Sequence, residues 1–249
     1  MRNLKLTIEY NGANFSGWQK QNGKRTVQGE LETAFAKLCP NENDIVVEGS
    51  GRTDSGVHAL GQVASVKIEN PIPTSRCKEV LNSRLPKDIR IKKVENAKDD
   101  FHARFSAKKK TYRYLVKLGE DVSAFEGDFV AVYSYKDVDI ETMKSASKVL
   151  IGKHDFQAFC SADTSVTNFE REIYDIKIEQ NKKMVVFEIT GNGFLYNMVR
   201  IVAGTLLDFG RKRLSANDMT KIIESKDRRL AGQTMPACGL YLKKVEYEK

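Results

Sequence analysis

The sequence predicts an α+β protein made of two halves that are built on antiparallel sheet. Apolar residues alternate with polar ones in short runs throughout the chain, which is typical of strands with one buried face. Helical stripes fall between pairs of such runs rather than after every strand, a pattern that favours antiparallel over parallel sheet. We expect an N-terminal half of residues 1–107 and a C-terminal half of residues 108–249, with no long linker between them.

The first half has the element order β-α-β-β-α-β. Alternation from Leu4 to Tyr10 predicts the first strand, with its apolar side chains on one face. Thr26 can cap a helix whose apolar stripe runs from Val27 to Leu38, and Pro40 lies just beyond its end. Further elements are expected as strands at 45–47 and 64–68, a helix at 75–85 that stops before Pro86, and a strand at 89–94.

The second half repeats this mixture of hairpin-like strands and helices, without a detectable sequence repeat. Its predicted strands lie at 112–118, 174–178, 185–189 and 240–245, and its helices at 138–150, 195–206 and 216–224.

Composition excludes several classes of protein. No apolar run approaches the ~20 residues that a membrane helix needs. The chain enters a strand pattern at once, so no signal peptide is expected, and a cytoplasmic location follows. The four cysteines and three histidines are dispersed, and there is no CxxC pair, which favours reduced thiols over disulfides or a metal site.

Charge is the most informative bulk property. Lys and Arg number 41 against 33 Asp and Glu, which gives a net charge of +8 and a pI near 9.2. Part of the excess is clustered at Lys108–Lys110, Arg211–Arg213 and Arg228–Arg229. A single charged run is usually a solvated face, but three together favour a polyanionic partner such as nucleic acid.

One polar turn, Gly51–Ala59, has the composition of a site. It places Asp54 two residues from Arg52 and between glycines, and the arginine could keep the carboxylate ionised. Its GxxxxG spacing lacks the Lys-Ser/Thr of a phosphate loop, and the third glycine of a dinucleotide fingerprint is missing. A structural turn with an Arg52–Asp54 pair remains the alternative on these residues alone.

Six blocks of sequence resemble the bacterial tRNA pseudouridine synthase A family, in that family's order and across nearly the whole chain. One departure is Asn11, which stands where the family usually has aspartate and which keeps turn geometry while losing a charge. The blocks are Tyr10–Gln21, Gly51–Ala59, Asp100–Ala107, Lys110–Tyr114, Gly193–Arg200 and Gly239–Leu242.

The resemblance implies a fold, a reaction and partners. It implies two ferredoxin- or RRM-like halves that share a central antiparallel sheet, with the active-site cleft between them. It implies isomerisation of uridine to pseudouridine, without metal or cofactor, at positions 38, 39 and 40 of the tRNA anticodon stem-loop. It also implies a homodimer. The target nucleotide must leave the base stack before its glycosidic bond can be reached.

The resemblance also assigns roles to residues. Asp54 is the catalytic residue, which acts on C2′, on C1′ or on C6 of the base. Tyr112, Arg200 and Leu240 bind the target nucleotide, and Arg52 reaches the RNA. His58, His102 and Trp18 sit inside the blocks, where packing or RNA contact is expected of them. The candidate phosphate contacts are Arg104, Lys108, Lys109, Lys110, Arg211, Lys212 and Arg213.

Three other functions remain open at this point. A paralogue with the same chemistry could act on ribosomal RNA, and a catalytically silent relative could only bind RNA. An aspartate-dependent hydrolase would need a metal cluster or a base for water, and the dispersed histidines offer neither.

Overall fold

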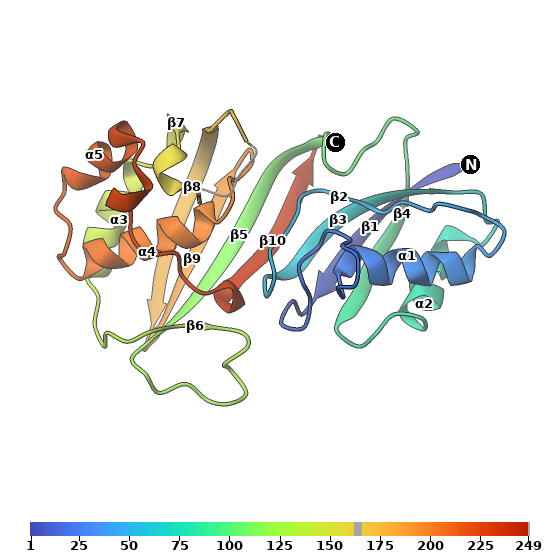
Figure 1. Cartoon of the computed structure of the whole chain (residues 1–249), viewed down its shortest axis with the longest axis horizontal. Coiled ribbons are helices and arrows are strands. Elements are labelled where there is room, and N and C mark those ends of the chain that lie inside the picture. The colour runs from blue at the N-terminus through green and yellow to red at the C-terminus, as the bar shows by residue number, and fades with distance from the viewer. Residues whose placement is uncertain (162–165, 249) are drawn as a thin grey trace. The chain divides into compact units, whose positions relative to one another are not determined.

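The computed structural model describes residues 1–161 and 166–248, which divide into two compact units (Figure 1). The first unit contains residues 1–108 and 241–249, and the second contains 109–240. The sequence assigned the whole segment 108–249 to the second half. From Tyr241 onward the last strand instead belongs to the first unit, where it pairs with another strand.

The first unit carries a sheet of order β4-β1-β3-β10, with β2 paired to β3. The pairs β1–β3, β1–β4 and β2–β3 are antiparallel, whereas β10 runs parallel to β3 with Tyr241 opposite His58. These two strands come from opposite ends of the chain, so no hairpin constrains their direction. The elements are β1 (Arg2–Tyr10), α1 (Val27–Leu38), β2 (Glu48–Gly49), β3 (His58–Ile68), α2 (Thr74–Asn82), β4 (Ile89–Ala97) and β10 (Leu240–Tyr247).

The predicted patterning accounts for β1 and α1. The alternating apolar side chains of β1 are buried, as expected for one covered face. Thr26 caps α1 through Oγ1, which accepts a hydrogen bond from Gly29 N at 3.3 Å. Val27, Leu31 and Phe35 of α1 are fully buried, so one stripe of the helix faces the core.

The strand predicted at 45–47 is wrong. Regular pairing starts later, in β2, and only Val47 of the three apolar residues is buried. Val47 N donates to the side chain of Glu32 on α1 rather than to a neighbouring strand, and Val46 is 51% exposed. The run 45–47 is therefore a loop that is held in place by one buried residue. The apolar pattern of such a loop cannot be distinguished from that of a short strand.

The second unit carries an antiparallel sheet of order β5-β9-β8-β7, with β6 added parallel to β5. Helix α3 packs on α4 and on β8, and α5 packs near β7. The elements are β5 (Ala107–Leu118), β6 (Ala131–Tyr133), α3 (Ile140–Lys148), β7 (Gly152–Asp155), η1 (Gln157–Phe159), β8 (Glu170–Asn181), β9 (Met184–Gly191), α4 (Met198–Gly210), α5 (Asp218–Ser225), η2 (Arg228–Leu230) and η3 (Ala237–Gly239).

Helix α4 is the most deeply buried helix of the second unit. Apart from Arg200, all of its residues are buried, and most of them are apolar, as expected of a helix that other elements cover on every side. It begins three residues later than the predicted start at Leu195, because Asn197 has a left-handed backbone with φ of 60°. The predicted α+β class is confirmed in both units. Among the described helices, none has the length and apolarity to cross a membrane.

Candidate active site

The Asp54 turn of the first unit is held against the loop that follows β1. Trp18 N donates to Thr53 O at 3.0 Å, and Gly56 N donates to Phe15 O at 3.4 Å. The Ser55 hydroxyl donates to the same Phe15 carbonyl at 3.1 Å. Asp54 itself is half-buried. The carboxylate therefore projects from a backbone that is fixed on both sides.

A glycine in that loop makes the close approach possible. Gly17 has φ of +87°, a conformation that side-chain-bearing residues rarely adopt. A Cβ at this position would lie 2.6 Å from Thr53 O and 3.2 Å from Asp54 C, inside van der Waals contact. The glycine of the first sequence block is thus required by the backbone beside Asp54.

A buried polar network closes the other side of the turn. The Tyr10 hydroxyl and Thr53 Oγ1 share a hydrogen bond of 2.7 Å. Gln62 Nε2 donates to Gly51 O at 3.0 Å, while its Oε1 accepts from the Ser50 hydroxyl at 2.6 Å. Gln62 is fully buried on β3. Sequence reasoning missed Gln62, although a glutamine inside an apolar strand run is a signal of a partnered polar site.

Tyr10→Phe is expected to lower the free energy of unfolding by about 1–2 kcal/mol at pH 7, because Thr53 loses a buried hydrogen-bond partner. Burial raises the pKa of Tyr10 to about 12. This contribution is therefore complete below pH 10 and is lost as the pH rises towards 12.

Urea unfolding of wild type and Tyr10→Phe at pH 7 and at pH 11 checks this expectation, since the difference between the two proteins should shrink at the higher pH. Tyr196→Phe, which changes an exposed tyrosine, is the control and should unfold like wild type at both values. A difference that grows with pH would contradict the assignment.

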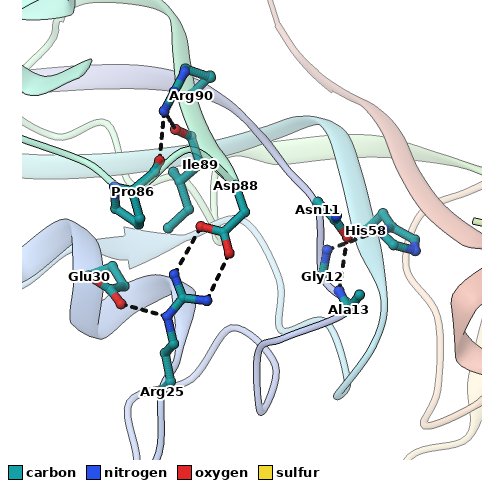
Figure 2. Close-up of polar contacts among 10 residues, drawn as sticks. All are labelled: Asn11, Gly12, Ala13, Arg25, Glu30, His58, Pro86, Asp88, Ile89 and Arg90. Carbon is teal, nitrogen blue, oxygen red and sulfur yellow. Dashed lines mark hydrogen bonds and ion pairs between the residues drawn. The ribbon is translucent and has the colours of Figure 1, made fainter. Parts of the chain in front are cut away.

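His58 has a structural role at the start of β3. Its Nδ1 accepts a hydrogen bond from Gly12 N at 2.9 Å (Figure 2). Its side chain is 1% exposed, and its ring stacks on Tyr241 with centroids 4.7 Å apart. Accepting through Nδ1 fixes the proton on Nε2 in the neutral ring. His58 thereby joins the loop after β1 to β3 next to the turn.

The departure at Asn11 preserves the local geometry. Asn11 Oδ1 accepts from Ala13 N at 3.1 Å, which is an Asx-turn that an aspartate oxygen could make equally well (Figure 2).

Arg25, at the other end of this loop, forms a bidentate ion pair with Asp88, at 2.8 and 2.9 Å, and a third hydrogen bond to Glu30. The loop that supports Asp54 is thus fixed at both of its ends.

Arg52 is exposed, and its Nε donates to Gln19 Oε1 at 2.9 Å. The contact described for Arg52 is therefore with the neighbouring loop, whereas the sequence suggested a pair with the carboxylate two residues on. An exposed guanidinium held at the rim of the turn remains accessible to a polyanion.

Tyr112, Arg200 and Leu240 all lie in the second unit. Tyr112 is buried on β5, opposite Ile189, and its ring meets the edge of Phe194 at 5.2 Å. Leu240 is buried at the end of η3.

Arg200 is half-buried on α4 and is held by two hydrogen bonds. Its Nε donates to Met235 O at 2.6 Å, and its Nη1 donates to Asn197 Oδ1, also at 2.6 Å. Both acceptors are uncharged, so neither of them offsets the positive charge of the guanidinium. That charge can therefore attract an anionic group.

The basic candidates differ in how they are held. Arg104 and Lys212 are exposed. Lys108 pairs with Glu248 at 2.8 Å in an exposed ion pair that competing phosphates can displace. The exposed Arg213 lies 3.6 Å from Asp208, which is buried on α4. Lys109 lies over the ring of Tyr174, Arg211 lies over the ring of Tyr135, and Lys110 is half-buried on β5.

Within 1–161 and 166–248, no three His, Cys, Asp or Glu side chains form a group that could hold a metal ion. The first unit thus carries the turn with Asp54, and the second unit carries Tyr112, Arg200 and Leu240.

Comparison with known proteins identifies the family. The family model described as tRNA pseudouridine synthase matches residues 6–106 and 146–248. A tRNA pseudouridine synthase A of Caldicellulosiruptor bescii is 46% identical, over 99% of this chain and 100% of that protein. A tRNA pseudouridine synthase A of Bacillus subtilis is 48% identical, over 98% of this chain and 99% of that protein. The chain therefore belongs to the tRNA pseudouridine synthase family.

Proposed function

We propose that this chain isomerises uridine to pseudouridine in the anticodon stem-loop of tRNA, at positions 38, 39 and 40, with Asp54 as the catalytic residue. The bond between N1 of uracil and C1′ of the ribose breaks, the base turns, and C5 bonds to C1′. The hydrogen on C5 leaves as a proton and N1 gains one, so the product is an isomer of the substrate.

The observation that carries the assignment of Asp54 is the construction of its turn. The half-buried carboxylate is flanked by Thr53 and Ser55, and both of these neighbours are hydrogen-bonded to surrounding structure. A carboxylate held this way can approach C2′, C1′ or C6 of a bound nucleotide without any rearrangement of the protein. Such positioning of the reacting groups supplies a large part of the rate enhancement by enzymes.

The roles of the second unit follow from the chemistry of its side chains. The edge-on contact with Phe194 fixes the Tyr112 ring, which suits stacking on uracil, and its hydroxyl is placed in this proposal to assist removal of the C5 proton late in the reaction. The guanidinium of Arg200, held by two neutral acceptors, suits pairing with a carboxylate or phosphate. Leu240 supplies apolar surface for the base.

Mapping of the modified nucleotides tests the proposed target. Wild type incubated with a tRNA transcript should introduce pseudouridine at 38, 39 or 40 wherever uridine is present, and a transcript with cytidine at these three positions should gain none. Modification of ribosomal RNA but not of tRNA would keep the chemistry and assign the chain to the alternative target.

Binding of tRNA should weaken steeply with salt, because each neutralised phosphate releases counterions. With four or more phosphate contacts, the slope of log K against log salt should be about −3 or steeper. Lys212→Ala should flatten this slope by about one unit. Lys78→Ala on α2, an exposed lysine outside the candidate set, should leave it unchanged. A nearly flat slope for wild type would remove the argument for a basic RNA surface.

We further propose a cytoplasmic homodimer. The dimer rests on the family resemblance, and the cytoplasmic location rests on cysteines that form no disulfide within the described part of the chain. Sedimentation of the purified protein at micromolar concentration should give twice the chain mass of 28.1 kDa. A single 28.1 kDa species that turns over tRNA would refute the dimer while leaving the catalytic proposal intact.

A further inference from the structure

The connection after β4, residues 101–106, forms a rigid loop in the first unit. His102 N donates to the Ser106 hydroxyl at 3.1 Å, and Ser106 N donates back to His102 O at 2.9 Å. Ala103 is anchored from both sides, since its N–H donates to Ser65 Oγ and its carbonyl accepts from the Tyr247 hydroxyl at 2.8 Å. The backbone conformation of the loop is thereby set by β3 and β10.

This rigid loop presents a large apolar side chain to solvent. Phe105 is 75% exposed, although phenylalanine is among the residues most often buried. Its ring lies 4.4 Å from the His102 ring, and the Arg104 guanidinium lies 5.6 Å from its centroid. The guanidinium carries a positive charge, and His102 Nδ1 accepts a hydrogen bond from Arg104 N at 3.1 Å. The loop therefore combines an open aromatic face with positive charge.

These neighbours favour RNA over protein as the partner. Contiguous apolar patches of several hundred Å² mark protein–protein contacts, whereas Phe105 is bordered in sequence by Arg104 and Ser106. An aromatic ring beside a guanidinium is the arrangement that binds an unpaired base, since the ring stacks on the base and the cation meets its phosphate.

We propose that Phe105 is a stacking platform for an unpaired base of the substrate RNA, with Arg104 on the adjoining phosphate. This inference rests on the proposed function, because it takes RNA as the substrate. Ser65, which anchors the loop, is seven residues along β3 from His58, where the Asp54 turn ends. At 3.2–3.4 Å per residue this separation is about 23 Å, so the stacked base is a remote one and not the target uridine.

The test is the affinity of full-length tRNA for wild type and Phe105 variants, measured by fluorescence anisotropy. Phe105→Ala should weaken binding about ten-fold, and Phe105→Leu should weaken it similarly, since leucine keeps apolar surface but has no ring to stack. Phe105→Tyr should bind like wild type. The matched control is Phe125→Ala, which removes another exposed phenylalanine (91%), from the loop between β5 and β6, and which should have no effect.

The salt dependence separates stacking from charge. Phe105→Ala should shift the plot of log K against log salt without changing its slope, whereas Arg104→Ala should lower the slope by about one unit. At saturating tRNA, kcat of Phe105→Ala should stay within about two-fold of wild type, because the platform lies far from the reacting nucleotide.

Three results would overturn the platform. These are wild-type affinity in Phe105→Ala, wild-type affinity in Phe105→Leu, or a changed sedimentation coefficient in Phe105→Ala, which would indicate a contact between protein chains. Failure of the proposed function is distinguishable, because it would appear as wild-type binding of tRNA without any pseudouridine formed.

Discussion

Asp54→Asn should lower the rate of pseudouridine formation by about 10⁴-fold or more, while tRNA affinity stays within a few-fold of wild type. Asparagine has nearly the same shape as aspartate, so the turn and its contacts through Thr53 and Ser55 should persist. What it lacks is the charge and basicity needed to attack C1′ or C6 or to take a proton from C2′. The measurement is single-turnover kinetics on tRNA, paired with anisotropy for binding.

The matched control for this substitution is Asp44→Asn, which removes the same charge from an exposed residue of the first unit. It should turn over at the wild-type rate, and its left-handed backbone, with φ of 56°, suits asparagine. If Asp54→Asn forms pseudouridine at a normal rate, the catalytic residue has been misassigned.

Gly17→Ala should destabilise the protein by about 3 kcal/mol and reduce turnover of the remaining folded protein by about 100-fold. The added Cβ would lie 2.6 Å from Thr53 O, which is too close for the backbone that carries Asp54 to stay in place. Left-handed backbone adds about 1–2 kcal/mol of this cost for any residue with a side chain.

Gly23→Ala separates these two effects. Gly23 also has a positive φ, of +70°, but a Cβ there would meet nothing within 4 Å. It should lose about 1 kcal/mol of stability and keep wild-type turnover. Urea unfolding and single-turnover rates of both variants decide the matter. Equal losses in Gly17→Ala and Gly23→Ala would show that the Asp54 turn does not depend on the close approach of Gly17.

The regular elements could be predicted because their signals are local. The apolar alternation of β1 and the capped stripe of α1 depend only on residues a few positions apart, and both elements formed where the pattern placed them. The turn with Asp54 was also accessible to sequence reasoning, since its glycines and charged residues occur together in one short segment.

What could not be predicted depends on partners distant in sequence. Val47 N donates a hydrogen bond to the side chain of Glu32, fifteen residues away. The apolar run at 45–47 is therefore a loop that this contact holds in place, and not the strand that the sequence predicted. Arg52 meets Gln19 of another loop, although Asp54 is nearer in sequence. Gln62 is satisfied by Ser50 and the turn, which only the folded arrangement reveals.

The most direct test of the central claim is tritium release from tRNA labelled at C5 of uridine, because the proposed reaction must replace the hydrogen on that carbon. Wild type should release tritium from tRNA and none from ribosomal RNA, and Asp54→Asn should release none from either. Wild-type protein that binds tRNA tightly yet releases no tritium from it would contradict the account.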